Sequence, residues 1–566
     1  MAFMSNFVNE LVEEINDKKI SNIRDVIKLQ NNLSRNIKPN KLPKLAEVLL
    51  KLNTNLKVKP VRTISGVAPV AIMTKPYKCP HGTCLFCPGG INSYFGDIPQ
   101  SYTGNEPASI RAVGNNFDGY LQTFNRLENY GAINHNFQKV EMIIMGGTFC
   151  SMDKKYQEEF VTYALKALND FSDMFFVNNK LVKEKFNEFF ELPGFFNEER
   201  TNRINDKLLK LKSESNLLKE QKRNETSNIR CVALCVETKP DFGLKEHGNE
   251  MLRLGVTRVE VGVQSVYDNV LKFFNRGHTD FDTRKSLQEL KDLGFKVSIH
   301  LMPGLISDKE KDLEGMKKIF SDSDYKPDML KIYPCRVFPG TGLEGLYKLG
   351  KFKPITDEEA ADLILEFKRI IPKYCRVQRI NRDIPSTIDV KGIEHANLRE
   401  IIKEKMKLKG YKCNCIRCRE PKDRVLDFSK LKFKVLKYNA SKGKEFFISA
   451  NIDDYLIGFC RLRFPFELLR EEITEKTGLI RELHVYSSAL GLGEKNEESL
   501  QHKGIGIRLM KIAEKIALKN GKNKLLVLSG IGVKEYYSKK LDYKREGVYM
   551  GKDLYKIEDY NAKKSQ

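Results

Sequence analysis

Seven short apolar segments, rich in β-branched residues, recur between residues 69 and 380 and constrain the fold of this chain more than any other feature. Each is followed by a polar loop, and most then by a helical pattern. Near-continuous apolar strands separated by helices are typical of a parallel sheet covered on its faces. The number of units predicts a complete or partial (β/α) barrel, with its active site at the carboxyl ends of the strands. The segments are PVAIMT (69–74), VEMIIM (140–145), CVALCV (231–236), TRVEVGV (257–263), KVSIHLM (296–302), MLKIYP (329–334) and RVQRI (376–380).

The sequence divides into four regions of different character. A chain of 566 residues is too long for one core and predicts about two to four domains. Residues 1–60 have a basic, helical pattern and precede the barrel at 61–390, which contains a polar, helical insertion at 180–228. Residues 391–430 carry a group of cysteines and form a linker. After residue 430, short alternating strands, a helix and a further strand predict a separate α/β domain at 431–566.

Three cysteines lie close together directly after the first predicted strand. Cys79, Cys84 and Cys87 have the spacing C-x4-C-x2-C. Three thiolates on one loop can bind three irons of a [4Fe–4S] cluster and leave the fourth iron open to the amino and carboxylate groups of a substrate. A structural zinc site with His81 as fourth ligand is the alternative. Radical S-adenosylmethionine (radical-SAM) enzymes usually have three residues in the first gap, so the four found here are a departure.

Polar or glycine-containing elements end three of the other predicted strands. Two glycines let backbone groups approach a ligand closely, and radical-SAM enzymes have a similar element that receives the amino group of the methionine part. Because the carboxyl ends of parallel strands share one edge, these residues are predicted to line the barrel mouth. For each of these three strand-end elements, the alternative is an ordinary capped turn between a strand and a helix. The candidate S-adenosylmethionine contacts are Gly146, Gly147, Thr148, Glu237, Gln264 and Ser265.

A second group of cysteines occurs in the linker. Cys413, Cys415 and Cys418 supply three thiolates within six residues, which favours a structural zinc site between the two large domains. The fourth ligand must come from elsewhere, with Cys335 as first choice and Cys375 as second. A redox pair is the alternative.

A glycine-rich turn opens the long helical pattern of the last region. Such a turn presents free backbone N–H groups to a pyrophosphate, although a helix that merely starts with glycines is the alternative. The order of strands and helices around it matches an acetyltransferase fold that binds coenzyme A. The candidate acetyl-CoA contacts are Gln501, His502, Lys503, Gly504, Ile505 and Gly506 in the turn, Glu482, Leu483, His484 and Val485 in the preceding strand, and Tyr537.

The chain is strongly basic. Lys and Arg number 97 against 74 Asp and Glu, which gives a net charge of +23. This excess favours a nucleic-acid partner, although a well-solvated, lysine-rich surface has the same composition. The sequence has no run of about 18 apolar residues and no secretory signal, so no membrane association is predicted. Clustered cysteines then indicate metal sites in a reducing compartment, the cytoplasm.

From about residue 60 to the end, the sequence resembles the catalytic subunit of Elongator, a radical-SAM barrel followed by a Gcn5-related N-acetyltransferase (GNAT) domain. Prokaryotic members of that family share the four-residue gap between the first two cysteines. The segments that carry the resemblance are RTISGVAPVA, CPGG, MGGTF, ETKPD, LGVTRVEVGVQSVYD, NRGHT, LKIYP, RDIPS, RELHVY, QHKGIG and the Tyr536-Tyr537 pair.

The resemblance implies a tRNA-modifying activity. A radical derived from S-adenosylmethionine would take hydrogen from the methyl group of acetyl-CoA, and the product would add to C5 of a wobble uridine to leave a carboxymethyl group. Lys296 is predicted to point into the barrel near the acetyl group, and Tyr536 or Tyr537 to contact acetyl-CoA. Segments 1–60 and 391–412 are predicted to bind tRNA, with the protein acting alone or as a dimer. There are two alternatives. One is a protein lysine acetyltransferase with a scaffold barrel, for which Glu482 and the tyrosines are the only evident bases. The other is a non-catalytic tRNA-binding subunit.

Overall fold

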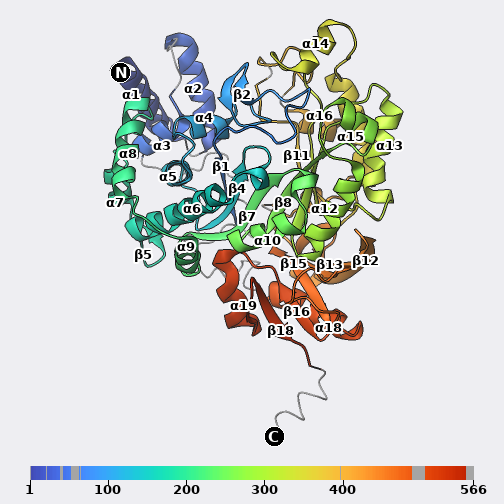
Figure 1. The fold of residues 1–566 in the computed structure, drawn as a ribbon. Helices are drawn as coiled ribbons and strands as arrows, with labels where there is room; N and C mark the ends of the chain where they lie inside the picture. Colours follow the sequence, from blue (N-terminus) through green and yellow to red (C-terminus); the bar gives the residue numbers. More distant parts are fainter. Residues whose placement is uncertain are drawn as a thin grey trace.

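The seven apolar segments form seven adjacent parallel strands, as predicted. The computed structural model describes residues 2–20, 22–37, 43–52, 63, 66–385, 387–395, 397–422, 424–486 and 504–555. The strand order is β1-β4-β7-β8-β9-β10-β11, and within the described residues β1 does not pair with β11, so the barrel is partial. Helices cover its outer face (Figure 1). The strands are β1 (Ala68–Met73), β4 (Lys139–Met145), β7 (Arg230–Thr238), β8 (Arg258–Gln264), β9 (Lys296–Leu301), β10 (Met329–Ile332) and β11 (Arg376–Ile380).

Each covering helix buries an apolar face against the outward side chains of the strands. Val259, Val261 and Val263 of β8, for example, belong to the main apolar core. Two small hairpins, β2 (Gly90–Ser93) with β3 (Gly96–Ile98) and β5 (Phe176–Val177) with β6 (Lys180–Leu181), were not predicted. The helices are α4 (Pro107–Val113), α5 (Gly119–Ala132), α6 (Lys154–Phe175), α10 (Lys245–Leu254), α11 (Asp268–Phe273), α12 (Asp280–Asp292), α13 (Lys309–Ser321), α14 (Gly342–Lys348), α15 (Asp357–Ile370), α16 (Leu398–Leu408) and α17 (Ile416–Arg419).

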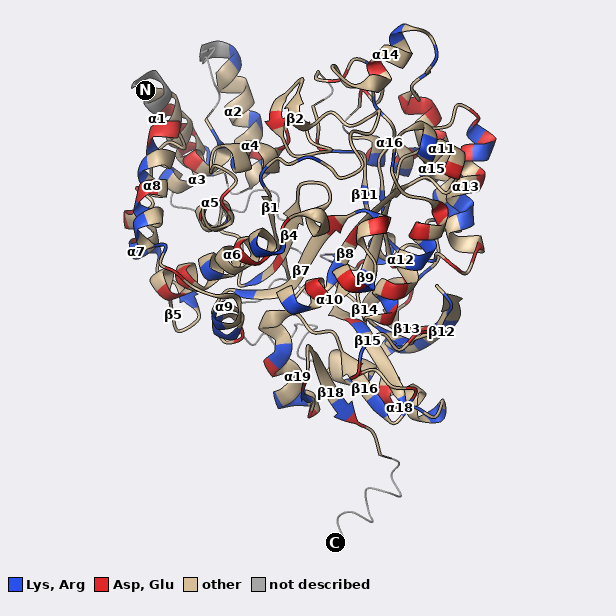
Figure 2. Ribbon diagram, viewed as in Figure 1, with Lys and Arg blue, Asp and Glu red and all other residues tan. Residues whose placement is uncertain are grey.

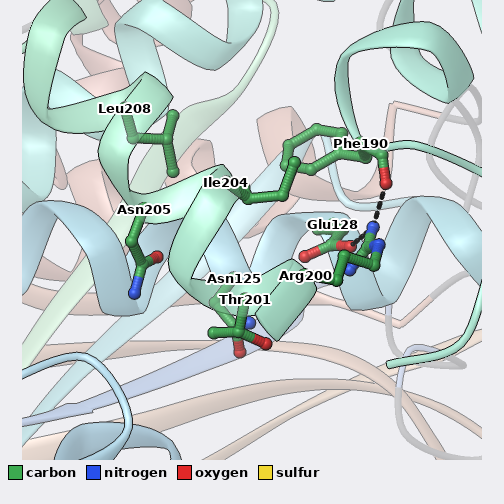
Figure 3. Close-up of a pocket in the computed structure, with 8 residues that line it drawn as sticks. All are labelled: Asn125, Glu128, Phe190, Arg200, Thr201, Ile204, Asn205 and Leu208. Atoms are coloured by element: carbon green, nitrogen blue, oxygen red, sulfur yellow. Dashed lines mark hydrogen bonds and ion pairs between the residues drawn. The ribbon is translucent and has the colours of Figure 1, made fainter. Parts of the chain in front are cut away.

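Two helical additions pack on the β1 side of the barrel. The N-terminal segment forms α1 (Ala2–Asp17), α2 (Ile23–Ile37) and α3 (Leu45–Leu52), which share a small core of their own. The insertion is helical as predicted, with α7 (Lys183–Phe189), α8 (Glu198–Leu211) and α9 (Leu217–Asn224). Arg200 of α8 forms a buried ion pair with Glu128 of α5 at 2.5 Å and also donates to the Phe190 carbonyl, beside the small pocket in Figure 3. This pair therefore anchors the insertion to the barrel.

The C-terminal domain is a second seven-stranded sheet. Its order is β12-β13-β14-β15-β16-β18-β17, and only β15 and β16 are parallel among its pairs. The strands are β12 (Lys432–Ala440), β13 (Gly443–Ile452), β14 (Tyr455–Phe464), β15 (Thr477–Val485), β16 (Lys524–Val527), β17 (Lys544–Glu546) and β18 (Tyr549–Asp553), with helices α18 (Ile505–Lys519) and α19 (Lys534–Leu541). The described part of the chain has no helix long and apolar enough to cross a membrane.

The second sheet packs against the amino ends of the barrel strands (Figure 1). Arg481 of β15 donates to the Phe295 carbonyl just before β9 and to both carboxylate oxygens of Asp328 just before β10, each at 2.7 Å. Arg463 of β14 binds the buried Asp292 at the end of α12 at 2.6 Å. Paired charges that are fully removed from water fix one relative orientation of the two domains.

Candidate active sites

The loop after β1 brings the three predicted cluster ligands together at the carboxyl end of the barrel. Cys84 and Cys87 are buried, and Cys79 is half-buried. Burial, together with the nearby Cys84, raises the pKa of Cys87 to about 11. A thiolate at Cys87 therefore needs a compensating cation, and three thiols on one loop fit the iron ions of a cluster.

The predicted glycine element lies at the same edge. Gly146 and Gly147 follow β4 with φ angles of +132° and +96°, which residues with a side chain rarely adopt. A Cβ at Gly146 would lie 2.2 Å from Thr74 Oγ1, so the loop is too close for any side chain. Thr148 Oγ1 is 3.8 Å from Cys79 Sγ, which places this turn against the cysteine loop.

The remaining mouth residues also lie at this edge. Glu237, near the end of β7, accepts a hydrogen bond from the Tyr102 hydroxyl at 2.7 Å. Gln264 ends β8 with a φ of +68°, and Ser265 follows it. The structure thus gathers the candidate S-adenosylmethionine contacts around the cysteine loop.

The barrel interior carries a network of charges that the sequence analysis missed. Glu260 of β8 accepts from His300 Nε2 at 3.1 Å and forms a buried ion pair with Lys331. Arg258 binds Glu141 at 2.8 Å and Glu260 at 3.0 Å. The sequence did contain a signal for this network, because charged residues at alternate positions of an apolar strand point to one face of the sheet.

An open strand edge occurs in the C-terminal domain, where β15 continues beyond its pairing with the parallel strand β16. Thr477–Ile480 pair with Lys524–Val527 of β16, whereas β15 extends to Val485. Within the described residues, this last stretch of β15 has backbone groups on one edge that β16 does not pair. Such an edge can hydrogen-bond an extended, amide-containing ligand.

The glycine turn opens α18 beside this edge. Gly504 has a φ of +66° and precedes the first helical residue, Ile505. A Cβ at Gly506 would lie 2.8 Å from the Tyr536 hydroxyl and within 4 Å of Leu483 and Val485. Of the predicted coenzyme A contacts, Leu483, Val485 and Gly506 thus meet beside Tyr536, while Gln501, His502 and Lys503 lie outside the described residues.

The two tyrosines of α19 differ in position. Tyr536 directs its hydroxyl toward the start of α18. Tyr537 is 6% exposed and belongs to the core of the C-terminal domain. Of the two tyrosines, Tyr536 is therefore the one placed to contact a ligand at the open edge of β15.

Lys296 and Glu482 bind each other across the domain interface. Lys296 is the first residue of β9, and its Nζ lies 2.8 Å from Glu482 Oε1, while Arg461 donates to the other carboxylate oxygen at 2.8 Å. Burial alone would raise the pKa of Glu482, but Lys296 and Arg461 lower it to about 2. A carboxylate with so low a pKa is a weak base at neutral pH, and Lys296 lies at the end of β9 away from the cysteine loop.

His484 lies in the same neighbourhood, on β15. Burial lowers the pKa of His484 to about 4, so the imidazole is neutral near pH 7. Its Nε2 atom has no hydrogen-bond partner among the described residues. This neutral, unpartnered imidazole nitrogen lies on the face of β15 that also carries Glu482, opposite to Leu483 and Val485.

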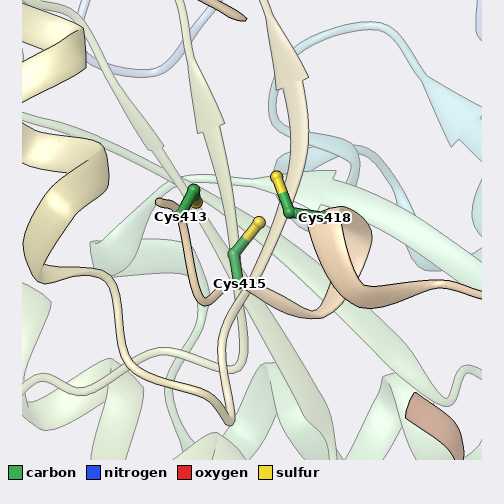
Figure 4. Close-up of side chains that lie close together, drawn as sticks. All are labelled: Cys413, Cys415 and Cys418. Carbon is green, nitrogen blue, oxygen red and sulfur yellow. The ribbon is translucent and has the colours of Figure 1, made fainter. Parts of the chain in front are cut away.

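The linker cysteines form a compact group (Figure 4). The sulfur atoms of Cys413, Cys415 and Cys418 all lie within 4.8 Å of one another, which fits a single metal ion. The choice of Cys335 as fourth ligand is wrong, because this residue is buried in the apolar cluster of Cys84 and Cys87 at the barrel mouth. Cys375, the second choice, lies beside the group, since its carbonyl accepts from the N–H of Ile416 at 2.9 Å.

Comparisons with known proteins match both halves of the chain. Residues 73–319 match the model of the radical SAM superfamily, 327–408 a radical-SAM C-terminal domain and 416–543 the acetyltransferase (GNAT) family. A "tRNA uridine(34) acetyltransferase" of Methanocaldococcus infernus is 47% identical over 88% of both chains. The Danio rerio "Elongator complex protein 3" is 35% identical over 98% of this chain and 97% of its own. The chain belongs to the Elongator complex protein 3 (Elp3) family.

A solved structure agrees with this assignment. The archaeal Methanocaldococcus infernus Elp3 with an N-terminal deletion has a TM-score of 0.70 and 40% identity, and the match covers 87% of this chain and all of that one. The predicted family, the partial barrel followed by a GNAT domain and the helical N-terminal segment are thus confirmed. Membership implies an enzyme that uses a [4Fe–4S] cluster, S-adenosylmethionine and acetyl-CoA.

The two candidate sites of this Elp3 chain lie at opposite ends of the barrel. The cysteine loop follows the carboxyl end of β1, whereas Glu482 meets Lys296 at the amino end of β9. A strand of six residues spans about 20 Å. The charged interior of the barrel lies between the two sites.

Substitution of Gly506 by alanine is expected to weaken acetyl-CoA binding roughly tenfold, or ~1.4 kcal/mol. The added methyl group would contact the Tyr536 hydroxyl at 2.8 Å and displace a ring that packs on the start of α18. Isothermal titration with acetyl-CoA measures the effect. Gly345→Ala in α14 is the control, because a Cβ there meets no atom within 4 Å and the backbone is helical; an equal loss of affinity in both variants would contradict the prediction.

Proposed function

We propose that this protein places a carboxymethyl group on C5 of the wobble uridine of tRNA, using S-adenosylmethionine and acetyl-CoA. The observation that carries the proposal is the cysteine loop gathered with the strand-end elements at one edge of a barrel that is fused to an acetyltransferase (GNAT) domain. The net charge of +23 fits a polyanionic substrate. The name "tRNA uridine(34) acetyltransferase" of a relative at 47% identity points to the same substrate.

The residues of the barrel mouth would bind the radical source. Cys79, Cys84 and Cys87 would hold the cluster, while Gly146 and Gly147 would leave space for the methionine part of S-adenosylmethionine. A bound cluster and S-adenosylmethionine supply the radical chemistry that activates the methyl group of acetyl-CoA. The chain itself would orient this ligand and exclude water from it.

The residues at the open edge of β15 and at the start of α18 would hold acetyl-CoA in the second domain. Gly504 and Gly506 would offer backbone N–H groups to the pyrophosphate, and the free edge of β15 would pair with the pantetheine amides. The Tyr536 hydroxyl would contact the acetyl end, whereas His484 lies on the opposite face of β15. The acetyl group would then have to reach the carboxyl end of the strands along the polar barrel interior.

Segments 1–60 and 391–412 remain our candidates for tRNA binding, with α1 to α3 in the first and α16 in the second. Figure 2 shows basic and acidic residues interspersed over the helices outside the barrel. We also propose that Cys375, Cys413, Cys415 and Cys418 hold a structural zinc ion, which would join the linker to the start of β11. Four thiolates would complete a closed tetrahedral site.

The test is anaerobic incubation of the reconstituted protein with tRNA, reductant, S-adenosylmethionine and acetyl-CoA, followed by nucleoside mass spectrometry. We expect carboxymethyluridine that depends on both co-substrates. Modification without acetyl-CoA, or no change in uridine, would refute the proposal. Acetyl transfer to a peptide amine by a Cys84→Ser variant, independent of tRNA, would instead favour the lysine acetyltransferase.

A further inference from the structure

Cys84 receives two side-chain hydrogen bonds, unlike its two partners in the cysteine loop. Arg276 Nη1 lies 3.3 Å and His81 Nε2 3.1 Å from Cys84 Sγ. Cys79 has Thr148 Oγ1 at 3.8 Å, and Cys87 accepts only from the backbone N–H of Ser101, at 3.2 Å. The electrostatic surroundings of the three sulfur atoms are therefore unequal.

The hydrogen-bond partners of His81 determine which of its nitrogens carries the proton. Lys239 Nζ lies 3.0 Å from His81 Nδ1 and 3.2 Å from Asp241 Oδ2, so the carboxylate holds the ammonium in place. An ammonium group only donates, so Nδ1 must accept and Nε2 must carry the hydrogen. His81 thus donates its Nε2 hydrogen to the sulfur of Cys84.

The segment Asn275–Gly277 holds the other side of the cysteine loop. The Asn275 amide donates to the Thr83 carbonyl at 2.9 Å, and Arg276 Nη2 donates to the Gly262 carbonyl at 2.6 Å. Gly277 has a φ of +69°, and a Cβ there would lie 2.4 Å from the Cβ of His81. The backbone of Gly277 therefore passes close to His81, and a side chain at this position would displace the imidazole from Cys84.

We propose that His81, Lys239 and Arg276 are positioning residues that raise the reduction potential of the cluster through the sulfur of Cys84. Hydrogen bonds to ligand sulfur stabilise the more negative, reduced form of an iron–sulfur cluster. Arg276 acts directly, and Lys239 acts through the tautomer of His81. The inference rests on the cluster of the proposed function and gives roles to residues of the ETKPD and NRGHT segments.

Redox titration of the reconstituted proteins, followed by electron paramagnetic resonance, tests this proposal. In His81→Phe and Arg276→Gln we expect about a tenfold lower ratio of reduced to oxidised cluster at a fixed potential, or ~59 mV for a one-electron couple. Lys239→Met should shift the potential in the same direction by a smaller amount. Lys245→Met, an exposed lysine at the start of α10, is the matched control and should not shift it.

A double-mutant cycle separates the relay from a simple charge effect. Lys239→Met should shift the reduction potential almost no further in the His81→Phe background. Lys239→Arg, made in the otherwise wild-type protein, should have the wild-type potential. An equal shift in both backgrounds, or a wild-type potential in His81→Phe with full iron content, would overturn the proposal. If His81→Phe does not retain its cluster, the comparison of Lys239→Met with Lys239→Gln decides, because Gln keeps a donor for His81 Nδ1 without the charge and neither variant changes a group that contacts a ligand sulfur.

The wild-type protein separates this inference from the proposed function. If it binds no iron and forms no 5′-deoxyadenosine, the proposed function fails. If it does both and the variants keep its potential, only the present inference fails.

Discussion

Replacement of Cys84 by serine is expected to abolish formation of 5′-deoxyadenosine and modification of tRNA, while acetyl-CoA binding stays at the wild-type level. Cys84 is buried at the barrel mouth, and no other thiol on its loop can replace it if Cys79 and Cys87 bind the remaining irons. The candidate acetyl-CoA site lies at the other end of the barrel, about 20 Å away. Loss at one site therefore leaves the other intact.

Iron analysis, nucleoside mass spectrometry and calorimetry with acetyl-CoA check this expectation. Cys335→Ser is the matched control, because Cys335 is buried in the same apolar cluster but lies outside the C-x4-C-x2-C motif. It should retain iron and activity. Full iron content and turnover in Cys84→Ser would show that the three cysteines do not bind the cluster.

The strands of both sheets could be predicted from the sequence because their apolar runs are short, β-branched and separated by helical patterns or turns. The residues at the carboxyl ends of the barrel strands could be predicted for the same reason, since parallel strands place these ends together. Gly146, Glu237 and Gln264 accordingly lie at one edge. Strands β17 and β18 were missed because their runs are short and interrupted by glycine.

The domain interface could not be predicted in this way. An apolar run does not show which end of the barrel a second domain covers, so the ion pair of Lys296 with Glu482 was not foreseen. The position of Lys296 at the start of its strand was the available signal, because a first residue lies at the amino end. The choice between Cys335 and Cys375 could not be made from the sequence for the same reason, because the sequence does not show which strand the linker approaches.

Replacement of Asp328 by asparagine is expected to lower the stability of the folded protein by about 3–5 kcal/mol. Its carboxylate accepts two hydrogen bonds from Arg481 at 2.7 Å and one from the Val297 N–H at 2.9 Å, and Arg461 lies 3.4 Å away. Loss of the negative charge would remove the bidentate partner of Arg481, which keeps only Glu445 at 2.9 Å, and would leave Arg461 with only the Glu482 carboxylate among the described residues. Because these groups join the barrel to the C-terminal domain, we also expect the two domains to unfold in separate steps.

The pH dependence of this contribution follows from the same contacts. Burial alone would raise the pKa of Asp328, but Arg481 and Arg461 hold it well below its usual range. The stabilisation is therefore complete above the ordinary aspartate pKa of about 4 and is lost only as the pH falls below it, so the full effect is measurable at neutral pH. Thermal unfolding and limited proteolysis at pH 7 provide the measurement.

A surface ion pair provides the matched comparison for Asp328. Asp322 binds Arg284 at 2.9 Å with a side chain 27% exposed, and exposed pairs contribute only about 0.2–1 kcal/mol. Asp322→Asn should therefore melt close to the wild type, whereas Asp328→Asn should melt well below it. Equal melting temperatures for the two variants would mean that the buried charges do not hold the domains together. The polar interior would then need another source of rigidity to keep β15 in place against the start of β9.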